Sequence, residues 1–349
     1  MPEVLDSGEA SRILRALEEE GWEVEAFIQG TMGRTAVLDN YLEDKVKATE
    51  ERPSECLRRL MEEFDYVVVA TDSPSPRKAA AFCWLLIEKV GGPLKPVVLA
   101  ETSSKSLMSW GRGGAVLAEA LARRLGYSLV EPPSFGETRW TKDGRKYRRL
   151  LAVDVGDLVM INGVVVGVAK SSDVILCEEG GVLRLEGVEV KEEGLRKLGP
   201  VDLWSAKVDT CRSLRRTRIE PRVVAKGVGR GVALIDHAGR SLYEYLGRVE
   251  GFVSVGDDTT RIVADLAYRF NSPVLGLVDG DLDGLLSLSK AAQGSLLIKV
   301  VSDDEAGEEV KAKVFKGAGL VDRGFDEVKS SVIELLRSSG KLLEVAKLG

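Results

Sequence analysis

The sequence is poor in histidine and cysteine, which limits the sites that it can form. His237 is the one histidine, so His-rich zinc sites are excluded and a histidine-based triad has one place to form. The four cysteines, Cys56, Cys83, Cys177 and Cys211, show neither CxxC pairing nor a metal-ligand spacing. This pattern favours buried thiols in a reducing compartment over disulfides or a zinc site.

The sequence also lacks any run near the ~20 apolar residues of a membrane span, and its N-terminus lacks the basic and apolar regions of a signal peptide. The 55 Asp and Glu residues outnumber the 49 Lys and Arg residues, for a formal net charge of -6. Such a chain is not expected to coat nucleic acid non-specifically. We expect a cytoplasmic protein with no membrane partner, long enough at 349 residues for two or three domains.

Residues 1–135 alternate strand-like and helix-like patterns, which predicts a Rossmann-like domain with a mostly parallel sheet. In such domains ligands bind beyond the carboxyl ends of the strands. Three segments that follow predicted strands, GTMGRTA, TDSPSPRK and ETSSKSLMSWGRGG, combine Gly, Ser or Thr with a basic residue. They suit an anion site that uses Arg34, Lys105 and Arg112, although turn chemistry alone would also place Gly and Ser there and no Walker A loop is present.

Residues 136–225 are predicted to form a β-hairpin-rich middle region that ends in a basic linker. Hairpin turns are indicated by DG within TRWTKDGRKYRR and NG within VGDLVMINGVVVGVAK, and SSDVILCEEGGVLRLEGVEV adds a third pair of strands. The basic residues gather in RKYRR and in DTCRSLRRTRIEPR. These arginines either pair with the surplus acids or contact a phosphate backbone, and both alternatives stay open.

Residues 226–349 are predicted to form a second α/β domain that ends in a helix-rich tail, FDEVKSSVIELLRSSGKLLEVAKL. Three successive strands of this domain end in acids. Parallel strands joined by right-handed crossovers bring such ends to one edge of the sheet. Carboxylates gathered there need a hard cation, so we expect Mg²⁺, or Mn²⁺ in its place. Alternatives are an EF-hand, disfavoured because Lys290 stands where a Glu belongs, and an Asp/Gly-rich turn that caps a helix. The candidate metal ligands are Asp257, Asp258, Asp279, Asp281 and Asp283.

This order of strands, helices and acids resembles the Toprim domain of topoisomerases, primases and related nucleases. GDDTTRIVADLAYRFNSPVLGLVDGDLDG is especially similar to the second half of that domain in the A subunit of topoisomerase VI. The resemblance implies that Asp279 and Asp281 form a metal-binding DxD pair and that Asp236 stands where the family has glutamate. Leu282 replaces the proline of the topoisomerase pattern, and we find no winged-helix segment with a tyrosine in that context, so DNA strand passage is not expected.

Across nearly its full length the chain also resembles an archaeal family known only as a domain of unknown function, common in methanogens. The strings that carry this resemblance are GTMGRTAVLD, PSECLRRL, EPPSFGE, INGVVVGVA, IDHA, VGDDTTRIVADLAYRF and LVDGDLDGLL. The resemblance implies an archaeal origin and no established activity.

Two function classes follow from these residues. The leading hypothesis is a Mg²⁺-dependent enzyme acting on a phosphate ester, nucleotide or nucleic acid, with Asp236 or His237 as general acid or base. Thr259, Thr260 and Arg261, at a predicted helix start, would hold the phosphate. The alternative is a regulatory protein that binds a nucleotide or nucleic acid without turnover, and homo-oligomerisation stays open in both.

Overall fold

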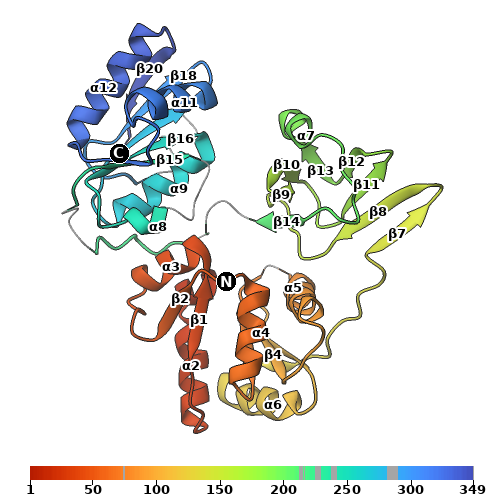
Figure 1. The fold of residues 1–349 in the computed structure, drawn as a ribbon. Helices are drawn as coiled ribbons and strands as arrows, with labels where there is room; N and C mark the ends of the chain where they lie inside the picture. Colours follow the sequence, from red (N-terminus) through yellow and green to blue (C-terminus); the bar gives the residue numbers. More distant parts are fainter. Residues whose placement is uncertain are drawn as a thin grey trace. The chain divides into compact units, whose positions relative to one another are not determined.

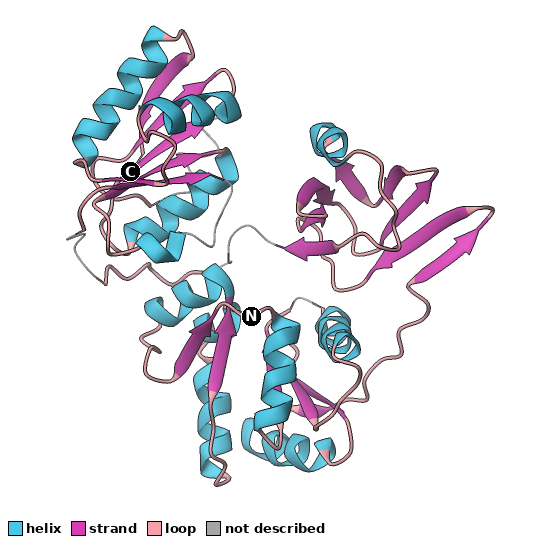
Figure 2. Cartoon of the chain, viewed as in Figure 1, coloured by secondary structure: helices cyan, strands magenta, loops and turns pink. Residues whose placement is uncertain are grey.

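A computed structural model describes residues 1–73, 75–211, 215, 217–224, 229–236, 242–280 and 290–348. The chain divides into two compact units, Met1–Arg218 and Ile219–Gly349, which are treated separately below. Figure 1 gives the element labels and Figure 2 shows that both units mix helices and strands. The predicted mixed α/β class is therefore confirmed.

The first part of the N-terminal unit alternates helices and strands as predicted, but its strands form two sheets instead of one. In one sheet β1 pairs with β2, in parallel. The other has the order β3-β4-β5-β6, in which β4 and β5 are the antiparallel pair. The elements are α1 (Glu3–Asp6), α2 (Glu9–Glu19), β1 (Ala26–Gln29), α3 (Gly30–Asp39), β2 (Val46–Thr49), α4 (Pro53–Glu63), β3 (Val67–Thr71), α5 (Pro76–Lys89), β4 (Val97–Glu101), β5 (Ser106–Trp110), α6 (Gly114–Leu125) and β6 (Ser128–Leu129).

Strand β4 shows why helices cover both faces of the larger sheet. Its side chains are apolar on both faces, so each face needs a cover. Val98 and Ala100 pack in the cluster that contains residues of α2 and α6. Val97 and Leu99 pack on the other face, in the cluster that contains residues of α4 and α5.

Two of the predicted ligand loops have a different structure from the one expected. GTMGRTA is not a loop, because α3 begins at Gly30 directly after β1. The segment predicted to run as a loop from Glu101 to Gly114 contains β5, which turns back along β4. The chain reverses tightly between β4 and β5 because Lys105 adopts the left-handed backbone conformation, with φ of 51°.

The middle region contains the three predicted hairpins, and all three are confirmed. Asp143 and Gly144 have φ of 52° and 76°, and Asn162 and Gly163 have φ of 51° and 86°, which are the positive values that type I′ turns require. The strands form two four-stranded antiparallel sheets, β12-β11-β8-β7 and β13-β10-β9-β14, around one core. The elements are β7 (Arg139–Lys142), β8 (Arg145–Leu150), β9 (Leu158–Ile161), β10 (Val164–Ala169), β11 (Val174–Glu179), β12 (Val182–Glu186), β13 (Val188–Val190), α7 (Glu192–Leu198) and β14 (Val208–Cys211).

The C-terminal unit is built on a six-stranded sheet with the order β19-β15-β16-β17-β18-β20. The four central strands are parallel, and the two edge strands run antiparallel to them. Helices α8 and α9 cover one face, and α11 and α12 cover the other (Figure 2). The elements are β15 (Val232–Asp236), α8 (Leu242–Tyr245), β16 (Gly251–Val255), α9 (Asp257–Tyr268), β17 (Val274–Val278), β18 (Leu296–Val300), α11 (Asp303–Lys313), β19 (Leu320–Val321), α12 (Phe325–Ser338) and β20 (Leu342–Lys347).

The tail was predicted to be rich in helix to its end, and this is wrong after residue 340. Helix α12 ends at Ser338, and Gly340, with φ of 71°, turns the chain. The residues that follow form β20 along β18, where they cover an otherwise unpaired strand edge.

Candidate metal centre

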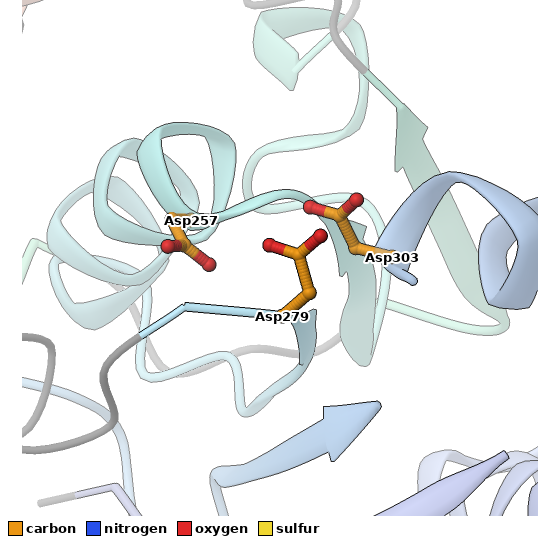
Figure 3. A group of neighbouring side chains, drawn as sticks. All are labelled: Asp257, Asp279 and Asp303. Carbon is orange, nitrogen blue, oxygen red and sulfur yellow. The ribbon is translucent and has the colours of Figure 1, made fainter. Parts of the chain in front are cut away.

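One aspartate follows each of the three strands β16, β17 and β18. Asp257 is the first residue of α9, Asp279 directly follows β17, and Asp303 is the first residue of α11. Because the three strands are parallel neighbours, their carboxyl ends meet at the same edge of the sheet. Figure 3 shows the three carboxylates turned toward a common space.

The three carboxylates are close enough to act on one ligand. One oxygen from each lies within 4.8 Å of the oxygens from the other two. Asp257 and Asp303 are half-buried, whereas Asp279 is exposed. The backbone N–H of Gly280 donates to the Asp257 carboxylate, but the buried Oδ1 of Asp257 has no hydrogen-bond partner among the described residues.

Burial and mutual repulsion both raise the pKa values of carboxylates in this group. The pKa of Asp257 is raised above its usual 3.8, first by burial and then by the charges of Asp279 and Asp258, while the Gly280 N–H opposes the shift. The pKa of Asp303 is also raised, first by burial and then by the charge of Asp279. Two carboxylates 4.8 Å apart repel by about 1 kcal/mol at the dielectric constant of water and by about 3 kcal/mol at that of a partly buried site. A cation bound among them would remove this repulsion.

Glycines bring the three aspartates together. Gly307 lies one helical turn after Asp303 in α11, and a Cβ at this position would lie 2.6 Å from Val255 Cγ1. Helix α11 can therefore approach β16 closely, which places Asp303 beside the start of α9. Gly280 has the same role after β17, because a Cβ there would lie 2.0 Å from Asp257 Oδ2.

The donor set fits a hard divalent cation. Carboxylate oxygens are the ligands that Mg²⁺ prefers, at about 2.0 to 2.1 Å, so that oxygens on opposite sides of the ion lie about 4.2 Å apart. Because three ligands of one ion cannot all lie opposite one another, the 4.8 Å limit is wider than a bound ion requires, and the exposed Asp279 side chain would rotate inward on binding. The buried Asp257 Oδ1, to which no described residue donates a hydrogen bond, has a lone pair that could bind an ion.

Other residues predicted for this site lie near the three aspartates but do not belong to their group. Asp258 is exposed on α9, and Asp236 is half-buried at the end of β15 on the same sheet edge; neither belongs to the group of three. Thr259 and Arg261 are half-buried in the first turns of α9. Thr260 is 1% exposed and its hydroxyl is 2.9 Å from Ser254 Oγ, so it packs inside the unit.

The residues predicted to hold an anion lie in the other unit. Arg34 is exposed on α3, 3.8 Å from Glu50. Lys105, directly before β5 in the sequence, and Arg112, two residues after it, are also exposed. In the loops after β3 and β4, the backbone N–H groups of Ser73, Ser103 and Ser104 donate to the buried carboxylate of Glu101, at 2.8, 3.2 and 2.7 Å. The protein thus supplies its own anion to these N–H groups.

The basic linker has one residue with a clear structural role. The Arg215 side chain is 3% exposed and pairs with Asp39, which is fully buried, and with Asp6 at 3.4 Å. For Arg215 the structure favours pairing with the chain's own acids over contact with a phosphate backbone. Cys56, Cys83 and Cys177 are free and buried, as predicted.

Residues 1–318 match the family described as "Uncharacterized protein conserved in archaea (DUF2117)". The chain belongs to this archaeal family. It is also 35% identical over 320 residues to the "Uncharacterized protein MJ0065" of Methanocaldococcus jannaschii, in an alignment that covers 88% of this chain and 87% of that protein. No solved structure matches the chain. The resemblance to the archaeal family is confirmed.

The part of the chain that matches the DUF2117 family includes Asp257, Asp279 and Asp303 and the whole of α11. It ends before α12 and β20 begin. None of the helices in the described ranges has the length and apolar character that a membrane crossing requires.

Asp303 was missed by the sequence analysis, although a signal for it was present. In KVVSDDEAGEEV an apolar strand ends in acids, as the three preceding strands of this unit do. Asp281 and Asp283, the other acids of the DGDLD motif, and His237 lie outside the described residues. Their predicted roles stay predictions.

Proposed function

We propose that this protein is a Mg²⁺-dependent enzyme that acts on a phosphate ester, nucleotide or nucleic acid at the carboxyl edge of its C-terminal sheet. One observation carries the proposal: Asp257, Asp279 and Asp303 present oxygens within 4.8 Å of one another, and one buried oxygen of Asp257 has no hydrogen donor in the described part of the chain. Mn²⁺ would serve in place of Mg²⁺ because it accepts the same oxygen ligands.

Residues around the three aspartates would have roles that suit a metal-bound phosphate. A bound divalent cation would neutralise charge on a phosphoryl oxygen. Asp257 and Asp303 would fix its position from the first turns of two helices, where the helix dipole favours negative charge. Arg261 lies one turn after Asp257 on the same face of α9 and would contact a second phosphate oxygen, with Thr259 beside it.

The resemblance to the Toprim domain has no support from the family match or from solved structures, so it stays a prediction beside this proposal. The parallel strands with acids at their carboxyl ends, including the first aspartate of the DxD motif, are what that resemblance implies. Asp236, at the end of β15, lies on the same edge but outside the group of three. It is therefore proposed as a proton donor or acceptor for the substrate instead of a metal ligand, and His237, the next residue in the sequence, shares this proposed role.

A small substrate panel tests the proposal. Purified protein is incubated with p-nitrophenyl phosphate, bis-p-nitrophenyl phosphate, nucleoside triphosphates, and single- and double-stranded nucleic acid, with Mg²⁺, with Mn²⁺ or with EDTA. We expect metal-dependent turnover of at least one substrate, and a fall of at least about 100-fold in kcat/KM for Asp279→Asn.

The matched control is Asp258→Asn, which removes the same charge from an exposed neighbour of the group. It should retain most of the activity. Equal activity of Asp279→Asn and the wild type would refute the proposed site. Thermal stabilisation by a nucleotide without turnover of any substrate would favour the regulatory alternative.

A further inference from the structure

A second candidate site lies in the N-terminal unit, where the hairpin β7–β8 borders a large cavity. The cavity has a volume of about 860 Å³, which lies in the range of small-molecule sites. Apolar side chains, among them Phe82, Leu86 and Leu150, form part of its wall. The same wall contains two arginines of the hairpin, Arg139 and Arg148.

The two arginines stand directly opposite each other. Arg139 of β7 and Arg148 of β8 are Cα partners in the antiparallel ladder, so their side chains extend from the same face of the hairpin. Like charges in this position repel and destabilise the strand pair. Burial and the charge of Arg139 together lower the pKa of Arg148 to about 10.

Neither arginine forms an ion pair with an acid among the described residues. Arg148 donates from Nη1 to the carbonyl oxygen of Ala206 at 2.9 Å, which is a neutral partner. Arg139 has no hydrogen bond or ion pair with any described residue. Asp209, the acid whose charge acts on Arg148, is itself paired with Lys207 at 3.1 Å.

Two other well-buried cations of the wall have acidic partners: Arg215 pairs with Asp39 and Asp6, as described above, and Lys78 pairs with two aspartates. Lys78 contacts Asp154 at 2.8 Å and Asp157 at 2.9 Å. Arg149, on the opposite face of the hairpin from Arg148, contacts Asp173 at 3.1 Å.

Acids also line the cavity, among them Asp72, Glu88 and Glu137, but none of the described acids forms an ion pair with Arg139 or Arg148. These two adjacent guanidinium groups therefore remain without an acidic partner beside the apolar part of the wall.

We propose that Arg139 and Arg148 form the anion-binding end of a ligand site, and that the ligand is a phosphate-bearing organic molecule of nucleotide size. Two guanidinium groups side by side match the two charges and three oxygens of a phosphate monoester. The apolar wall would cover the body of the molecule. The site lies in the N-terminal unit and does not depend on the metal centre or on the proposed enzymatic activity.

The test is calorimetric titration of the full chain in EDTA at constant ionic strength, with AMP, inorganic pyrophosphate and adenosine as probes. EDTA excludes binding through a metal ion. We expect AMP to bind more tightly than pyrophosphate, because the apolar wall contributes, and adenosine to bind at least about 10-fold more weakly than AMP. Pyrophosphate binding as tight as AMP binding would overturn the role of the apolar wall.

Substitutions locate the site. Arg139→Gln should weaken AMP binding at least about 10-fold, because a charge-assisted hydrogen bond is lost. It should also raise the Tm of the ligand-free protein, because the repulsion with Arg148 is relieved. Arg139 is exposed, so this variant stays informative even if Arg148→Gln does not fold.

The matched control is Lys142→Gln, which removes the same charge from the other face of the same hairpin. Its AMP affinity should equal that of the wild type. The proposal is overturned if AMP fails to bind the wild type at millimolar concentration, or if Lys142→Gln and Arg139→Gln weaken binding equally.

Discussion

At the scale of single residues, the surroundings of Asp257 disfavour its ionised carboxylate, and a bound cation would offset this. It is half-buried, no described residue donates a hydrogen bond to its Oδ1, and the charges of Asp279 and Asp258 add to the effect of burial on its pKa. Two backbone N–H groups donate to these carboxylates, Gly280 to Asp257 and Asp304 to Asp303, the latter at 2.7 Å. They stabilise the negative charges only in part, because the pKa values of both carboxyl groups are still raised. The metal-free protein therefore carries unfavourable electrostatic energy in this group.

Asp257→Asn should stabilise the metal-free protein at neutral pH by about 1 to 3 kcal/mol, the repulsion of one carboxylate pair at this spacing. The pKa of Asp257 is raised in the folded state, so the folded protein binds this proton more tightly than the unfolded chain. The stability of the metal-free wild type should thus fall as pH rises from 3.8 through the raised pKa. Urea unfolding in EDTA at a series of pH values measures this, and a steeper fall in the variant than in the wild type would contradict it.

Arg215→Ala should destabilise the N-terminal unit by about 3 to 5 kcal/mol, because it removes a buried cation that pairs with the buried Asp39. Urea unfolding followed by tryptophan fluorescence measures the loss. Arg218→Ala is the control, since Arg218 is exposed in the same linker. A loss below 1 kcal/mol would mean that the buried pair does not hold the linker to α3.

At the scale of elements, the metal centre depends on how closely α11 packs against the sheet. Gly307 allows this approach, and the first turn of α11 then brings Asp303 to the carboxyl edge of β16 and β17. Ser302 begins the helix, because its hydroxyl accepts a hydrogen bond from the Glu305 N–H at 3.4 Å.

Gly307→Ala should push α11 away from β16, since the new Cβ would lie 2.6 Å from Val255 Cγ1. We expect a loss of about 1 to 3 kcal/mol in stability, as for other overpacked cores, and weaker Mn²⁺ binding because Asp303 moves with the helix. Glu308→Ala, at an exposed position of the same helix, should change neither property. Unchanged Mn²⁺ affinity in Gly307→Ala would show that Asp303 is not a ligand.

How far the elements could be predicted depends on whether local residues decide them. The hairpin turns at Asn162-Gly163 and Asp143-Gly144 were predictable, because few other residues adopt two positive φ values in succession. The residues of β20 pair with β18, more than 40 positions earlier in the sequence, and no local sequence pattern indicates that pairing. Asp303 was missed for a related reason, because its place in the site depends on the packing of α11.

At the scale of the whole molecule, each unit has a core of its own. Val253, Leu275 and Val328 belong to the core of the C-terminal unit, and Leu99 and Leu176 belong to cores of the N-terminal unit. The three aspartates come from the C-terminal unit alone, and the arginine pair comes from the N-terminal unit alone. Each candidate site can therefore be tested in the intact chain through the unit that contains it.

Differential scanning calorimetry of the full chain should show two unfolding transitions, one for each unit. Mn²⁺ should raise the Tm of one of them, because a ligand stabilises the unit to which it binds. AMP in EDTA should raise the Tm of the other. If both ligands shift the same transition, one of the two candidate sites is wrongly assigned.

The central claim, that Asp257, Asp279 and Asp303 hold one divalent cation, is tested most directly by anomalous diffraction from crystals of the full chain soaked in Mn²⁺. The account predicts an anomalous peak about 2.0 to 2.2 Å from an oxygen of each of the three carboxylates. It also predicts that this peak disappears in crystals of Asp279→Asn. Manganese found only elsewhere on the protein, with no peak among the three carboxylates, would contradict the claim.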